Sequence, residues 1–197
     1  LRFAAQFREE GLNLQDFSPG GGFAISYTRD QEPPEIAAYA ETIIAAMKAT
    51  CNELGMAAPR LIIEPGRSIV GPAGVALYRV GAIKEIPGVR KYVSVDGGMG
   101  DNIRPALYQA SYEVIVANKV NDPAGETVTI AGKYCESGDL LASDVTLPDL
   151  ESGDIIAIPA AGAYCPSMAS NYNLNPMPPM VLVNDGQSRL IRRRESY

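Results

Sequence analysis

Two short segments in the first third of the chain combine glycine with an apolar run or a charged group. The first, which follows the apolar run 61–63, consists of Glu64, Pro65, Gly66 and Arg67. The second, which follows the strand-like segment 12–17, consists of Gly20, Gly21 and Gly22. α/β barrels carry their chemistry at such strand ends, and glycines let backbone N–H groups approach a phosphate. We therefore predict one shared anionic ligand, although the glycines could equally form a flexible loop and residues 64–67 a surface turn.

Residues 96–108 follow another strand-like run and are rich in glycine and charge. Within them, Arg104 could offer a planar, bidentate guanidinium to a carboxylate, with the hydroxyl of Tyr108 nearby. The alternative is a long irregular loop that turns at Arg104 and Pro105.

The three cysteines differ in their surroundings. Cys135 is followed by Glu136, a serine, a glycine and an aspartate, which is unlike a core position. Cys51 belongs to the apolar face of a predicted helix and is interpreted as structural. Tyr164 follows a buried run, where a core tyrosine is the ordinary interpretation, and we assign no role to Cys165.

The elements that must position these residues change in character along the chain. Strand-like segments at 12–17 and 61–63 flank a helix that starts after Pro34 and stops at Gly55, which predicts α/β structure. From residue 69 onward, β-branched runs alternate with turn residues and predict mostly antiparallel strands. The expected strands are 75–83, 92–95, 112–120, 127–130, 154–158 and 180–183. We place the boundary near residue 70, which gives domains 1–70 and 71–197.

Composition excludes several classes of function. The net charge is −6 and the basic triplet 192–194 is typical of a solvated tail, so no nucleic-acid surface is expected. An odd number of cysteines, 3, argues against a disulfide framework, and the lack of histidine removes the usual zinc sites and the Ser-His-Asp triad. We expect a cytoplasmic protein with no membrane partner and no metal. A chain of 197 residues is too short for a full (β/α)8 barrel of roughly 250 residues, so we expect a fragment.

Five motifs occur in the order found in one enzyme family. The chain resembles diaminopimelate decarboxylase, a pyridoxal-phosphate enzyme of the alanine-racemase-like barrel class, over nearly its whole length. The resemblance implies the last strands of a (β/α)8 barrel followed by a β-sandwich or barrel domain. The motifs that carry it are Gly20-Gly21-Gly22-Phe23, Glu64-Pro65-Gly66-Arg67, the segment from Asp96 to Tyr108, Cys135-Glu136-Ser137-Gly138-Asp139 and Gly162-Ala163-Tyr164.

The resemblance also implies a role for each matching residue. The glycines 20–22, the backbone at Pro65, Gly66 and Arg67, and the hydroxyl of Tyr164 would hold the phosphate of pyridoxal 5'-phosphate. Glu64 would face the pyridine nitrogen, and Cys135 would be the proton donor. The groups that would bind the amino-acid substrate are Arg67, Arg104, Tyr108, Glu136 and Tyr164. In similar enzymes the cysteine loop of one subunit completes the site of the other, so a homodimer is expected.

The implied reaction is the decarboxylation of meso-2,6-diaminopimelate to L-lysine and CO2. The lysine that similar enzymes use to bind the cofactor has no counterpart in this sequence, so we expect the chain alone to be inactive. Alternatives are a sister decarboxylase for ornithine, arginine or carboxynorspermidine, and a non-catalytic regulator of the same fold. A β-rich binding module would fit residues 74–197 but leaves the two glycine-bearing strand ends unexplained.

Overall fold

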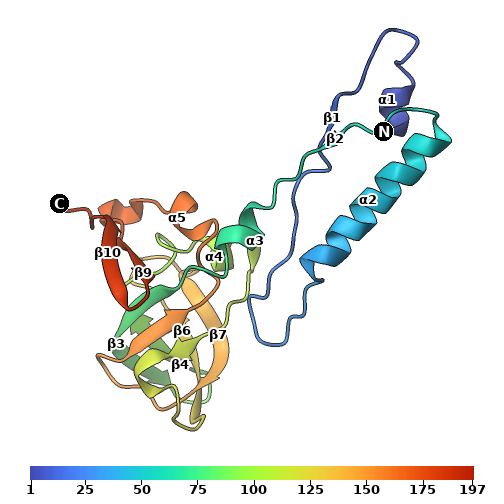
Figure 1. Ribbon diagram of the computed structural model, residues 1–197. Coiled ribbons are helices and arrows are strands. Elements are labelled where there is room, and N and C mark those ends of the chain that lie inside the picture. The colour runs from blue at the N-terminus through green and yellow to red at the C-terminus, as the bar shows by residue number, and fades with distance from the viewer.

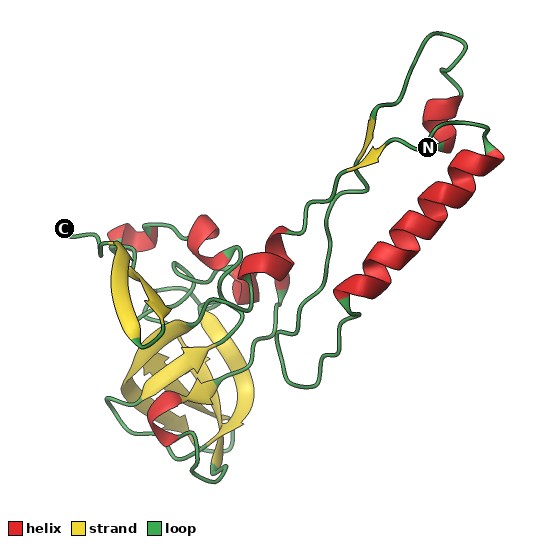
Figure 2. Ribbon diagram, in the orientation of Figure 1, coloured by secondary structure: helices red, strands yellow, loops and turns green.

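The computed structural model describes residues 1–197 and has two parts of different character (Figure 1). The N-terminal part is extended, and the C-terminal part is built around a sheet (Figure 2). The N-terminal elements are α1 (Arg2–Ala5), β1 (Asp16–Phe17), α2 (Ile36–Glu53), β2 (Arg60–Leu61) and α3 (Gly66–Val70). The C-terminal strands are β3 (Ala76–Ile86), β4 (Arg90–Val95), β5 (Ile115–Val116), β6 (Glu126–Ala131), β7 (Leu140–Leu147), β8 (Ile155–Ile158), β9 (Met180–Asn184) and β10 (Gln187–Arg192). Short helices α4 (Arg104–Tyr108), η1 (Ala117–Lys119), α5 (Cys165–Met168) and η2 (Tyr172–Leu174) connect them.

The long helix α2 confirms the prediction made from its apolar spacing. It begins after Glu35, which is extended at φ −60° and ψ 147°, and it stops before Gly55, whose φ is +57°. A glycine in the left-handed region is a common way to end a helix. Only Met47 and Cys51 are buried, which confirms that Cys51 is structural, while much of the helix surface is exposed.

Strands β1 and β2 form a parallel pair that is shorter than predicted. Asp16 pairs with Arg60 and Phe17 with Leu61, so the predicted extents 12–17 and 61–63 were wrong. Each strand has only one neighbour, and that neighbour supplies hydrogen bonds over a short stretch. Residues on either side have strand-like sequences but no partner. The N-terminal helix α1 is also short, since it ends at Ala5 and turns lead from there to Gly11.

A curved six-stranded sheet forms the core of the C-terminal part and approaches a closed barrel (Figure 1). Its order is β5-β8-β3-β4-β6-β7, in which only β4 and β6 run parallel. The mostly antiparallel arrangement predicted from the turn residues is therefore confirmed. Inward-facing side chains of these strands, with others from the connecting segments and α5, fill a core of 16 buried residues, of which Val93, Val128, Ile130, Ile156 and Ile158 are fully inaccessible.

One predicted strand in this part is shorter than expected, and two strands were not predicted. In the predicted strand 112–120, only Ile115 and Val116 pair with β8, and η1 follows. The N–H of Glu113 instead donates to the carbonyl of Tyr27, which takes the segment out of the ladder. Strands β7 and β10 were not predicted from their own residues, because charged side chains interrupt both. In the structure, Asp144 of β7 has a positive φ of 54°.

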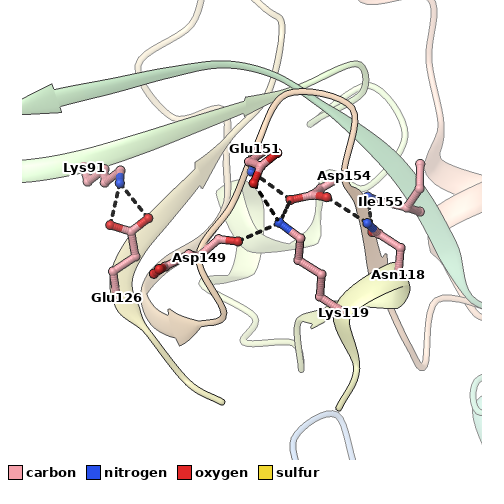
Figure 3. Close-up of polar contacts among 8 residues, drawn as sticks. All are labelled: Lys91, Asn118, Lys119, Glu126, Asp149, Glu151, Asp154 and Ile155. Carbon is pink, nitrogen blue, oxygen red and sulfur yellow. Dashed lines mark hydrogen bonds and ion pairs between the residues drawn. The ribbon is translucent and has the colours of Figure 1, made fainter. Parts of the chain in front are cut away.

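An ion-pair cluster fastens η1 to the turn before β8 (Figure 3). The carboxylate of Asp154 is buried and accepts from Lys119 Nζ at 2.9 Å and from Asn118 Nδ2 at 2.7 Å. It also accepts from the backbone N–H of Glu151 at 2.7 Å. Lys119 donates in addition to the carbonyl of Asp149, so the cluster is internally satisfied and has a structural role.

The antiparallel ribbon of β9 and β10 leaves a large apolar surface open. Its exposed side chains are Val181, Leu182, Val183, Leu190 and Ile191. None of the helices combines the length and the apolar character needed to cross a bilayer.

Candidate active site

The two glycine-bearing segments predicted to share a ligand lie side by side. The parallel β1–β2 pair brings them together, and beyond it the N–H of Glu64 donates to the carbonyl of Gly20 at 3.1 Å. Gly21 packs so closely on the Glu64 backbone that a Cβ there would lie 3.2 Å from its carbonyl carbon and nearer still to the oxygen. Gly20 and Gly22 have φ values of +85° and +84°, a region that glycine enters without strain. The glycines are therefore required by the conformation.

Ser18 holds both segments and was not singled out as a site residue from the sequence. Its hydroxyl donates to Glu64 Oε1 at 2.8 Å and accepts the N–H of Gly20 at 3.1 Å. This connection orients a carboxylate that is otherwise exposed. A serine two residues before a positive-φ glycine is a local signal that could have found it.

Two arginines from distant segments converge on one tyrosine ring. Arg67, in α3, lies over the ring of Tyr164 at 5.3 Å, and Arg104, at the start of α4, lies over the same ring at 5.4 Å. Arg104 also lies 4.9 Å from the ring centre of Tyr27. Helices α3 and α4 both lie near the point where the extended part joins the sheet (Figure 1). Neither guanidinium forms an ion pair with a carboxylate, so both are available to an anionic ligand.

The backbone presents Tyr164 to this site in an uncommon conformation. Its φ is +69° and its ring is 40% exposed, so the ordinary interpretation as a core tyrosine was wrong. Cys165 follows immediately, begins α5 and is buried. A positive φ at a bulky residue costs free energy and is often found at functional positions.

A cleft of about 510 Å³ opens beside Arg67 and Tyr164. Gly66, Ser167 and Arg192 also line it. Arg192 is half-buried and donates to the carbonyl of Pro178 at 3.0 Å. The prediction of a solvated basic tail was therefore wrong at Arg192, whereas Arg193 and Arg194 are exposed.

Behind Arg104 lies a buried polar chain that the sequence did not reveal. Arg104 Nη1 donates to the hydroxyl of Tyr112 at 2.7 Å, and that hydroxyl lies 3.6 Å from Cys165 Sγ. Burial raises the pKa of the Cys165 thiol and also that of the Tyr112 phenol, so both groups stay protonated at neutral pH.

Cys135 and Glu136 lie apart from this cleft. Both are exposed and do not line it. Their loop is anchored by buried Asp139, which accepts the N–H of Tyr134 at 2.9 Å and the N–H of Met99 at 2.6 Å. One carboxylate thus joins the cysteine loop to the glycine-rich segment 96–108.

The segment that begins at Arg104 is a short helix, α4, so the alternative of an irregular loop was wrong there. Tyr108 ends this helix with a side chain that is 60% exposed. It makes no hydrogen bond to Arg104.

Comparisons with known proteins agree with this arrangement. Residues 23–162 match the family model described as pyridoxal-dependent decarboxylase, C-terminal sheet domain. The chain is 53% identical over 196 residues to a diaminopimelate decarboxylase of Bacillus subtilis, covering 100% of this chain and 44% of that protein.

Solved structures give the same picture. A structure of diaminopimelate decarboxylase from M. jannaschii in complex with L-lysine is similar at a TM-score of 0.90 and 42% identity, covering 99% of this chain and 44% of that one. A lysine/ornithine decarboxylase from Vibrio vulnificus has a TM-score of 0.74 at 24% identity, covering 88% and 45%, and shares the fold. The chain thus spans less than half the length of the relatives it matches.

Proposed function

Since this chain belongs to the family of pyridoxal-dependent decarboxylases, whose C-terminal sheet domain it contains, we propose that it serves the decarboxylation of meso-2,6-diaminopimelate to L-lysine and CO2. Its relatives at 42–53% identity are diaminopimelate decarboxylases. The related structure with L-lysine bound supports an amino-acid substrate.

The observation that carries the proposal is the pair of guanidiniums on the Tyr164 ring. Arg67 and Arg104 approach that ring at 5.3 and 5.4 Å and have no acidic partner in the chain. Diaminopimelate, unlike ornithine, has a second carboxylate, which stays in the product L-lysine and needs a fixed cation. A site built around Arg104 penalises substrates that leave this cation unpaired.

The residues at the strand ends fit pyridoxal 5'-phosphate. Gly20 and Gly22 have open space where a Cβ would stand, so a phosphate could approach their backbone, and the hydroxyl of Tyr27 is buried without a partner beside Arg104. We infer that the glycines 20–22, the backbone at residues 65–67 and the hydroxyl of Tyr164 hold the phosphate. Glu64, oriented by Ser18, would hold the proton on the pyridine nitrogen. The bound cofactor supplies the electron sink for the departing CO2.

The remaining roles concern substrate and proton. Arg67 and Arg104, with Tyr108 and Tyr164, would bind substrate carboxylates, and Glu136 the distal ammonium. Cys135 would deliver the proton that replaces the lost carboxyl group. Because Cys135 and Glu136 do not line the cleft beside Arg67 and Tyr164, the proposal includes a cytoplasmic homodimer in which this loop completes the partner's site. Residues 1–70 would complete a (β/α)8 barrel and residues 71–197 would form the β domain.

The test is CO2 release from meso-diaminopimelate by the full-length enzyme with added cofactor. Ornithine, arginine and carboxynorspermidine are tested as alternative substrates, and Arg104→Gln is compared with the wild type. We expect activity on diaminopimelate alone, with its KM raised in the variant. Activity on one of these alternative substrates would favour a sister decarboxylase. No activity on diaminopimelate or on any alternative substrate would favour a non-catalytic regulator.

A further inference from the structure

The side chain of Arg104 has only one hydrogen-bond acceptor within the chain. Its Nη1 donates to the hydroxyl of Tyr112 at 2.7 Å. Its other contacts are the faces of three rings, of Tyr27 at 4.9 Å, Tyr164 at 5.4 Å and Tyr112 at 5.8 Å. Ring faces attract a cation but allow it to slide and rotate, whereas a hydrogen bond is directional. The Tyr112 hydroxyl therefore fixes the direction in which the free N–H groups of Arg104 point.

Tyr112 is itself held rigidly. The residue is 4% exposed, and its ring meets that of Tyr27 edge to face, with centroids 5.1 Å apart and planes at 81°. Because its oxygen accepts from Arg104, its own hydrogen is free to be donated onward. Cys165 Sγ, at 3.6 Å, is the acceptor in reach and is also 4% exposed. The hydroxyl is thus held between a cation and a buried thiol.

This series of polar contacts ends next to Tyr164, whose ring lies under both arginines. Cys165 directly follows Tyr164, so whatever fixes the start of α5 also constrains the backbone of Tyr164. The contacts from Arg104 through Tyr112 to Cys165 therefore link this arginine to the backbone next to Tyr164, whose ring it also contacts.

We propose that Tyr112 is a positioning residue that orients Arg104 for the second carboxylate of the substrate, with Cys165 as its support. This inference rests on the proposed function for the identity of the substrate. It assigns preference for dicarboxylates over monocarboxylates to a buried hydroxyl that does not touch the ligand. Most of the Arg104 N–H donors stay free for a bidentate carboxylate.

The experiment compares Tyr112→Phe with Tyr78→Phe in the full-length holoenzyme. Tyr78 is a matched control, because its hydroxyl is also buried but has no hydrogen-bond partner. In Tyr112→Phe we expect KM for diaminopimelate to rise roughly ten- to hundredfold with kcat within about threefold, as for a lost hydrogen bond to a charged group. Affinity for L-lysine, which keeps the carboxylate that does not leave as CO2, should fall by a similar factor in calorimetry, whereas affinity for cadaverine, which has no carboxylate, should stay unchanged. Tyr78→Phe should leave the KM and the lysine affinity as in the wild type.

A second pair of variants tests the support. Cys165→Ser retains an acceptor for the Tyr112 hydroxyl and should behave as the wild type, whereas Cys165→Ala should raise KM. That increase should vanish when Tyr112 is already phenylalanine, because the two residues act as one unit. An unchanged KM in Tyr112→Phe, or an equal loss of affinity for cadaverine, would overturn the proposal.

Calorimetry separates this inference from the proposed function. If the wild type does not decarboxylate diaminopimelate, the proposed function fails. Binding of pimelate, a plain dicarboxylate, against hexanoate then still reports on Arg104. A preference for pimelate that Tyr112→Phe abolishes supports the positioning role, and a preference that the variant retains refutes it.

Discussion

Replacing Gly21 by alanine should separate the two strand ends that form the candidate cofactor site. The new Cβ would lie 3.2 Å from the carbonyl carbon of Glu64 and closer to its oxygen. Carbon and oxygen pack best at roughly 3.5 Å or more, so one backbone has to move by about 1 Å. The neighbouring hydrogen bond from Glu64 to Gly20, now 3.1 Å long, would stretch beyond its useful range.

The size of the effect follows from the cost of overpacking. Forcing an extra carbon into a packed site costs about 1–3 kcal/mol. If that cost falls on the bound conformation, affinity for pyridoxal phosphate should decrease about five- to 150-fold. Contacts to the pyridine ring and to the phosphate of the cofactor should both weaken, because Glu64 lies on the displaced segment.

The assay is a cofactor titration of the full-length enzyme, followed by absorbance. Gly81→Ala is the matched control, since Gly81 is exposed in β3 and the nearest atom to its new Cβ, the carbonyl oxygen of Ser94, would lie at an ordinary 3.7 Å. Far-ultraviolet circular dichroism checks that both variants fold. Wild-type affinity in Gly21→Ala, or an equal decrease in both variants, would refute the reasoning.

Three further outcomes are expected. Burial raises the pKa of Asp154, but hydrogen bonds from neighbouring donors outweigh it and hold this pKa below its usual value. The contribution of Asp154 to stability is therefore present above about pH 4 and is lost as pH falls through the folded-state pKa. At pH 7, Asp154→Asn should lower the free energy of unfolding by about 2–4 kcal/mol in urea titrations, whereas the exposed Asp144→Asn should change it by less than about 0.5 kcal/mol; equal effects would contradict the structural role. Cys135→Ala should lower kcat about 100-fold or more without weakening cofactor binding, and a matching decrease in cofactor affinity would argue against a proton donor. Ser18→Ala should weaken cofactor binding about fivefold in the same titration while Ser18→Thr retains it, because only the hydroxyl orients Glu64.

Local patterns predicted what local forces decide. Helix α2 was predictable because its apolar spacing, the prolines before it and Gly55 after it all act within a few residues. The contact between the triple glycine and residues 64–67 was predictable as well, since both follow strand-like runs and the ends of parallel neighbours meet.

Long-range contacts decided the rest. Tyr27 lies in a segment without regular structure and Tyr112 in a run that alternates like a strand, so neither carries a local sign of contact with Arg104. From the sequence, Arg192 looked like part of a charged tail. Its burial depends on its place at the end of β10 and on its hydrogen bond to the carbonyl of Pro178, which no local pattern shows. The extents of β1 and β2 depended on how far each strand found a partner.

The parallel pairing of Asp16 with Arg60 also bears on how the protein folds. These residues lie 44 positions apart, and the ladder they begin is only two residues long on each strand. Closing so large a loop costs entropy before the few hydrogen bonds return any stability, so the pairing belongs among the late events of folding. A ligand that binds only the paired strands favours the folded state by mass action. Cofactor supply during synthesis should therefore raise the yield of correctly folded enzyme.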